Sequence, residues 1–142
     1  MKIHSHKWLA LSALMTLLPL HYASADPDCS KLVLDSKWGT EKVGGYFAGA
    51  YPSLQVTLER AGCMIGPEET EQIFQEILAQ HEQDPQWNSL ESSLTAQQKR
   101  DSVRFQLECQ LSLSPVPDPI TLEPMRKGVS LDAFKKMKCN TP

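Results

Sequence analysis

Four cysteines constrain this chain more than any other feature of its sequence. Cys29, Cys63, Cys109 and Cys139 are widely spaced, and none forms a Cys-x-x-Cys pair that would favour zinc binding or redox cycling. In an exported protein an even number of cysteines predicts disulfides. The sequence permits three pairings; we expect Cys29–Cys63 and Cys109–Cys139, because each pair brackets a local unit. Each such loop is expected to stabilise the fold by about 3–4 kcal/mol.

The first 25 residues have the three parts of a cleavable secretory signal peptide. Lys2 and Lys7 give a positive start, an apolar run extends from Trp8 to Leu18, and small residues precede the site after Ala25. The apolar run is much shorter than the ~20 residues of a membrane-spanning helix. We therefore expect residues 1–25 to be removed and the mature protein to be periplasmic or secreted.

The composition of the mature chain limits its partners and its chemistry. Removing 25 of 142 residues leaves 117, which predicts one domain over residues 26–142. The net charge of −3 becomes −5 without Lys2 and Lys7, which argues against nucleic acid as a partner. Only one of the four histidines, His81, remains. Any histidine-activated nucleophile would have to use it.

Helical spacing of apolar residues dominates the first two thirds of the mature chain. We expect a short helix over 29–36, a second helix through 43–54, and a third over 67–83 that begins with Pro67 and is stopped by Asp84-Pro85. Residues 87–94 suggest another short helix. Thr95 and Gln98 match a capping box, which marks a helix start.

The pattern changes to strict alternation between Val103 and Leu113. A period of two predicts a half-buried strand whose polar side chains face solvent. Residues 120–122 would return as its antiparallel partner, and a short helix is expected over 130–138. The predicted fold is α+β and mainly helical: a small disulfide-bonded domain with N-terminal helices and a C-terminal β-hairpin. An all-α fold is the alternative.

The sequence contains none of the familiar catalytic signatures. We find no nucleophile elbow, zinc-binding His-Glu-x-x-His or dinucleotide fingerprint. The acidic residues around 68–84 are typical of a solvated helix, and His81 is interpreted as a partly buried histidine at a helix end. We expect no enzymatic activity, no metal ligands and no cofactor.

A series of landmarks runs through about half of the mature chain. They are Cys29, Gly45-Tyr46-Phe47-Ala48-Gly49, Cys63, Pro67, Thr70, Gln72, the apolar helix through Leu78, and Pro85. Their order resembles the Rap1a/Tai-type immunity proteins, periplasmic proteins that neutralise peptidoglycan amidases delivered by rival bacteria. The resemblance implies an all-helical region that binds a toxin through a protruding loop. The alternating segment 103–113 departs from the family, and no contact residue can be carried over.

These observations favour an inhibitor or immunity protein that blocks an exported hydrolase or toxin by occlusion. The candidate partner-binding residues are Trp87 and the proline-rich loop residues Pro115, Val116, Pro117 and Asp118. Prolines fix the conformation of such a loop before binding. The alternative is a chaperone-like protein, an envelope-assembly subunit or a secreted virulence factor. A homodimer is compatible with either hypothesis.

Overall fold

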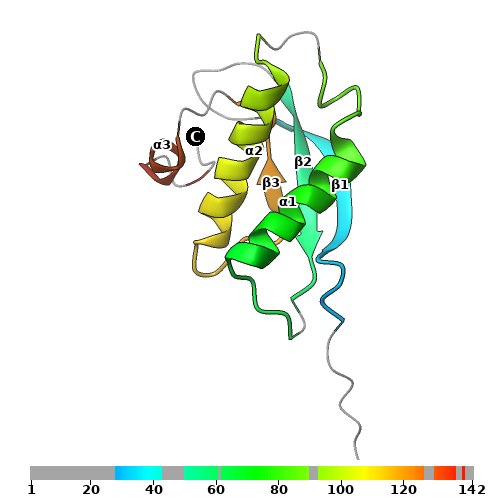
Figure 1. The fold of residues 1–142 in the computed structure, drawn as a ribbon. Helices are drawn as coiled ribbons and strands as arrows, with labels where there is room; N and C mark the ends of the chain where they lie inside the picture. The colour runs from blue at the N-terminus through cyan, green and yellow to red at the C-terminus, as the bar shows by residue number, and fades with distance from the viewer. Residues whose placement is uncertain are drawn as a thin grey trace, which may run out of the picture.

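The computed structural model describes residues 28–42, 50–60, 62–89, 93–126, 130–136 and 139. Within them the chain forms a three-stranded antiparallel sheet and three helices (Figure 1). In chain order the elements are β1 (Val33–Lys42), β2 (Ala50–Leu58), α1 (Pro67–His81), α2 (Ala96–Leu111), β3 (Ile120–Leu122) and α3 (Leu131–Lys136). The α+β class is confirmed. The expected signal peptide and residues 43–49 lie outside the described part of the chain.

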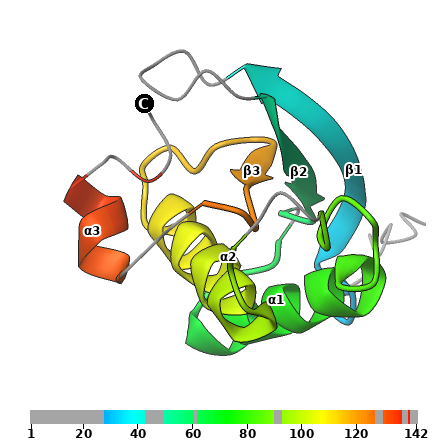
Figure 2. The same ribbon diagram turned by 90° about the horizontal axis from the view of Figure 1, so that it is seen from above.

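The helices α1 and α2 cover one face of the sheet, and α3 packs against α2 (Figure 2). The strand order is β1-β2-β3, so β2 is central. Buried apolar side chains from both layers meet in one core: Leu54, Val56, Ile73, Ile77, Val103, Leu107, Ile120 and Leu122. Burying a side chain of this size contributes about 1.5–3 kcal/mol. None of the described helices is long and apolar enough to cross a membrane.

The helices expected near the mature N-terminus are wrong. The segment 29–36 turns into β1 at Val33, and residues 50–54 of the expected second helix belong to β2. The side chains of β2 alternate, with Leu54, Val56 and Leu58 buried and Gln55 and Thr57 partly exposed. This period of two is the spacing of a strand with one face in the core. The all-helical region implied by the family resemblance is likewise not found here.

The third expected helix is confirmed, whereas the short one after it is wrong. The helix α1 begins at Pro67, and Glu69 accepts a hydrogen bond from the Gly66 N–H, which caps its first turn. Residues 85–88 then form a turn instead of the expected helix over 87–94. The capping box is confirmed, because Thr95 and Gln98 exchange hydrogen bonds at the start of α2.

The strand expected over 103–113 is wrong, because this segment lies within α2 and the turn that follows it. There is therefore no hairpin between it and residues 120–122. Those residues do form a strand, β3, but β3 pairs with β2. The prediction failed because it assigned the polar residues to solvent. On α2 a row of polar side chains, Ser102, Gln106 and Gln110, is buried.

Two of these side chains complete the outer edge of β3. The Gln106 amide donates to the Glu123 carbonyl and accepts from the Glu123 N–H, each at 2.8 Å. The Gln110 amide does the same for Thr121, at 2.6 and 3.2 Å. Each glutamine thus replaces the peptide group of a fourth strand. The two amides thus provide hydrogen-bond partners for buried backbone groups at this edge, and the Glu123 carbonyl also accepts from the Arg126 N–H at 3.0 Å.

The spacing of the two elements makes this pairing work. Gln106 and Gln110 are four residues apart, about 6 Å along a helix. Thr121 and Glu123 are two residues apart, about 6.6 Å along an extended chain. Alternate residues of a strand direct their N–H and C=O groups to the same side, so both pairs can form at once. The helix can therefore run along the edge of the sheet and close it.

On the other side of the molecule, Glu76 attaches α1 to the start of β1. Its carboxylate accepts hydrogen bonds from the N–H groups of Leu32, at 3.1 Å, and Val33, at 2.8 Å. Burial raises the pKa of Glu76, but hydrogen bonds from Gln72 and these two N–H groups, with the charge of Lys31, outweigh it. The net result is a pKa below the ordinary value of 4.5.

Both disulfides join the cysteines that were expected to pair. Cys29–Cys63 connects the segment before β1 to the one before α1, with Cα atoms 5.8 Å apart. Cys109–Cys139 connects the last turn of α2 to the chain just after the C-terminal end of α3, with Cα atoms 5.3 Å apart. The expected helix over 130–138 is observed as Leu131–Lys136, and residues 137–138 lie outside the described part.

Replacing Gln106 with Met should destabilise the protein strongly. The substitution leaves the buried N–H of Glu123 without its acceptor, which costs about 1–3 kcal/mol, whereas the Glu123 carbonyl keeps a hydrogen bond from the Arg126 N–H. Gln97→Met, on the exposed side of the same helix, is the matched control and should change the free energy of unfolding by no more than about 0.5 kcal/mol. Urea unfolding of the oxidised proteins measures both. Equal effects of the two variants would contradict the role given to Gln106.

Glu76→Gln should weaken the fold at neutral pH and reduce its sensitivity to acid. The lowered pKa of Glu76 means that its stabilisation is present above about 4.5 and is lost as the pH falls through the lower folded value. Replacing the carboxylate by an amide removes this term and costs about 1–3 kcal/mol at pH 7. Thermal unfolding between pH 3 and 7 tests it. A variant whose melting temperature falls as steeply with acid as the wild type would argue against this assignment.

Candidate functional site

The loop that joins α2 to β3 spans residues 112–119. We call it the occluding loop, after the occlusion predicted from the sequence. Its exposed residues are Ser112, Leu113, Ser114, Pro115, Asp118 and Pro119. Gln110 and Thr121, just before and just after it, are joined by the two hydrogen bonds described above, which close its base. The loop therefore leaves the domain from a fixed pair of anchor points.

The inner side of the occluding loop is held by Arg60, which follows β2. Its guanidinium group donates to the carbonyl of Val116 at 3.1 Å and to that of Pro117 at 2.5 Å. The Val116 side chain packs against the core. Of the four loop residues predicted to bind a partner, Val116 and Pro117 therefore face inward, whereas Pro115 and Asp118 are exposed. The outward pair is available for contact, and the inward pair fixes its position.

Trp87 is not available to a partner. Its residue is only 1% exposed and belongs to the main core cluster. The turn after α1 directs the indole inward, where its large apolar area is buried. The prediction that Trp87 contacts a partner is therefore wrong. From the sequence alone, an aromatic residue between two helices can be either a partner contact or a core residue. The packing in the folded structure distinguishes the two.

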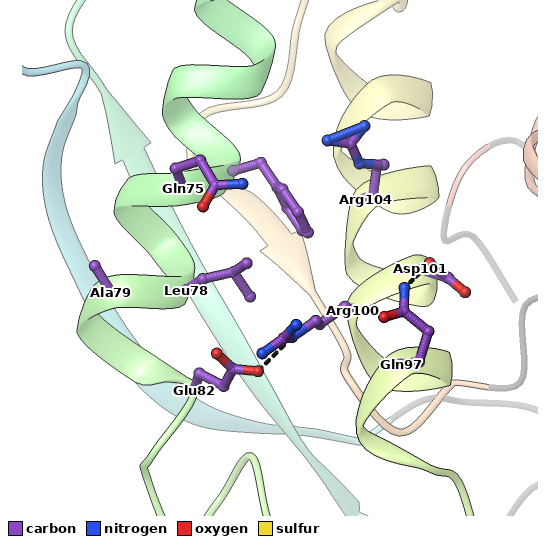
Figure 3. A pocket seen from close by; sticks show the side chains of 9 residues that line it. Gln75, Leu78, Ala79, Glu82, Gln97, Arg100, Asp101 and Arg104 are labelled. Atoms are coloured by element: carbon purple, nitrogen blue, oxygen red, sulfur yellow. Dashed lines mark hydrogen bonds and ion pairs between the residues drawn. The ribbon is translucent and has the colours of Figure 1, made fainter.

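A second surface feature is a hollow of about 630 Å³ between α1 and α2 (Figure 3). Phe74 and Leu78 give it an apolar floor. Arg100 pairs with Glu82 across it, and Arg104 lies 4.7 Å from the centre of the Phe74 ring. Arg104 also pairs with an acidic residue of α1, Glu71. Both guanidinium groups are thus neutralised within the chain, and such exposed pairs contribute little net stability.

A chain of polar contacts lies where the C-terminal end of α1 meets β1. The Ser36 hydroxyl is 2.7 Å from Nε2 of His81, whose Nδ1 is 2.8 Å from Oδ2 of Asp84. The Trp38 indole N–H donates to the same carboxylate oxygen at 2.7 Å. These bonds from Trp38 and then His81 hold the pKa of Asp84 below its ordinary value of 3.8. His81 is buried at the end of its helix, as expected.

Sequence reasoning missed Arg60, Ser36 and Asp84. Ser36 and His81 are 45 residues apart, and Arg60 and Val116 are 56 apart. No local spacing links residues so distant, because the fold alone brings them together. Within the described residues, no three His, Cys, Asp or Glu side chains are grouped to hold a metal ion.

Comparison with known proteins gives no match to any family model, curated protein or solved structure. The resemblance to Rap1a/Tai-type immunity proteins stays a hypothesis.

Replacing Arg60 with Met should loosen the occluding loop without unfolding the domain. The Val116 and Pro117 carbonyls lose their donors, and the loop should become more susceptible to protease. Limited digestion followed by mass spectrometry should show cleavage within 112–119 at least several times faster than in the wild type. The control is Lys136→Met, which removes one exposed positive charge from α3. Lys99 on α2 is not suitable as a control because it is buried. Unchanged loop cleavage in the Arg60 variant would contradict the anchoring role.

Proposed function

We propose that this chain is a periplasmic or secreted inhibitor that binds a partner hydrolase and blocks its active site with the occluding loop. The observation that carries the proposal is the construction of this loop. Its base is closed by Gln110 and Thr121, its inner carbonyls are held by Arg60, and its outer residues are free to meet a partner. The protein would act by occlusion and not by turnover.

The fixed loop lowers the entropic cost of binding. Ordering a flexible residue costs about 1–2 kcal/mol for its backbone, and a loop of eight residues would lose much of its affinity in this way. Here the folded domain has already ordered the loop, so contact energy can appear as affinity. This is the same advantage that prolines confer, and three of them, Pro115, Pro117 and Pro119, lie in this segment.

The chemistry of the loop tip fits a cleft with an apolar subsite. Among the residues that the structure describes, Leu113 is one of three large apolar side chains that are exposed, at 38%, and it precedes Pro115 by two residues. The exposed Asp118 adds one negative charge to the loop. An apolar contact surrounded by polar groups is the usual arrangement of a protein interface.

The disulfides support the proposed location. Two bonds close loops of 34 and 30 residues of sequence separation in a small domain. Such bonds persist in the periplasm or outside the cell and are rare in reducing compartments. An inhibitor of an exported hydrolase must work in the same place as its target.

The test begins with capture of a partner by the mature, oxidised protein, residues 26–142. Extracts of periplasm and secreted material serve as the source, and bound proteins are identified by mass spectrometry. We expect one stoichiometric partner with hydrolase activity that the protein inhibits. Leu113→Asp should weaken inhibition at least tenfold by placing a charge at the loop tip. Ser93→Asp adds the same charge before the opposite end of α2 and should inhibit like the wild type.

Other outcomes point elsewhere. Many unrelated clients would favour the chaperone-like alternative, and a stable assembly without hydrolase activity would favour an envelope subunit. Equal inhibition by both charge variants would place the contact away from the occluding loop.

A further inference from the structure

We propose that Ser36 is a nucleophile, that His81 is its general base, and that Asp84 orients His81. The site would react with activated esters that carry an apolar acyl group. Three elements supply the residues: Ser36 lies on β1, His81 ends α1, and Asp84 lies in the turn that follows. The inference goes beyond inhibition and departs from the expectation of a non-catalytic protein.

The order of the hydrogen bonds gives each group one role. An ionised carboxylate only accepts hydrogen bonds, so Asp84 requires the proton of His81 on Nδ1. Nε2 then carries a lone pair and faces the Ser36 hydroxyl at 2.7 Å, closer than the second acceptor of this hydroxyl, Gln80 Oε1, at 3.3 Å. This is the direction in which a histidine removes a proton from a serine nucleophile. The Trp38 indole, which can only donate, fixes the Asp84 oxygen that binds His81.

The burial of the three groups suits these roles. His81 is only 9% exposed, and its ring meets the Trp38 ring edge to face with centroids 5.8 Å apart. The base is therefore shielded, while the Asp84 side chain is 34% exposed and Ser36 is partly exposed. The strand β1 is an outer strand of the sheet, and the end of α1 lies against it (Figure 1). A small ester could reach the hydroxyl from that side.

The neighbours of Ser36 indicate an apolar acyl group. Leu34, two residues earlier at an irregularity in the pairing of β1 between Val33 and Asp35, is 53% exposed, and Trp38 is two residues later and partly exposed. An acyl chain that contacts these side chains would cover apolar surface that is now in water, at about 25 cal/mol per Å².

The polar chain is not needed to attach α1 to β1. Glu76 already binds the N–H groups of Leu32 and Val33, and Gln72 binds the carbonyl of Ser30. These contacts hold the same two elements together at the other end of their interface. An ordered serine, histidine and carboxylate is therefore additional to what docking requires, which favours a chemical role.

The reaction follows from the geometry. The Ser36 Oγ attacks the ester carbonyl carbon, its proton passes to Nε2 of His81, and the carbonyl electrons move to oxygen. The tetrahedral intermediate collapses, the C–O bond to the leaving alcohol breaks, and His81 gives that oxygen the proton. Water then attacks the acyl carbon and gives a proton to Nε2, and Ser36 leaves with that proton restored. The products are one acid and one alcohol.

The experiment uses mature oxidised protein and a fluorophosphonate probe, whose phosphorus traps an activated serine. Peptide mapping of the wild type should place the label on Ser36. Hydrolysis of p-nitrophenyl butyrate should be at least ten times faster than in Ser36→Ala and His81→Gln. Ser30→Ala removes an exposed hydroxyl elsewhere and should leave both signals unchanged.

Asp84→Ala tests the positioning residue separately. It removes the acceptor that Trp38 and His81 share and that holds the His81 proton on Nδ1, so labelling at pH 7 should fall at least tenfold. Melting temperatures show whether each variant is folded. Labelling of Ser36 in the wild-type protein tests the proposal even if a variant fails to fold. Absence of label on Ser36, or equal labelling in folded His81→Gln, would overturn the proposal. Neither result bears on inhibition by the occluding loop. That loop adjoins β3, at the edge of the sheet opposite to β1.

Discussion

The pairing of two glutamine side chains with the edge of β3 organises the structure. A strand of three residues has little pairing of its own, and β3 contacts only β2 within the sheet. The amides of Gln106 and Gln110 add four hydrogen bonds to Glu123 and Thr121, so the edge is completed by a helix. An unpaired edge is open to association with other chains, and covering it with a helix removes that hazard.

The two edges of the sheet are consequently different. At β3, the side chains of α2 occupy the edge and the occluding loop begins one residue after that helix ends. At β1, the Glu76 carboxylate of α1 accepts hydrogen bonds from the N–H groups of Leu32 and Val33 at the start of the strand, and the end of α1 lies beside the strand further along. The first arrangement displays a rigid loop, and the second brings Ser36 next to His81. The two candidate sites therefore differ because different elements lie against β3 and β1.

Only features set by local sequence could be predicted here. Pro67, the Thr95 capping box and the strand at 120–122 were identified correctly because turn chemistry and spacing determine them. The segment 103–113 was not, because its alternation coincides with a helix whose buried side is partly polar. In β2 the side chains around Val56 also alternate, but the apolar residues that precede them have helical spacing, which predicts a helix through 43–54. Contacts such as Arg60 with Val116 depend on the whole fold and leave no local signal.

The second disulfide and the glutamines together determine the rotation of α2 about its axis. Neighbouring helical residues are about 100° apart, so Cys109 and Gln110 point in different directions. Cys109 packs with Phe134 of α3 and is bonded to Cys139, while Gln110 reaches Thr121. Either contact alone would leave the helix some freedom to turn; both together leave one orientation. Because the occluding loop starts two residues later, its direction is fixed by the same pair of contacts, and a covalent bond distant from the loop thus contributes to its shape.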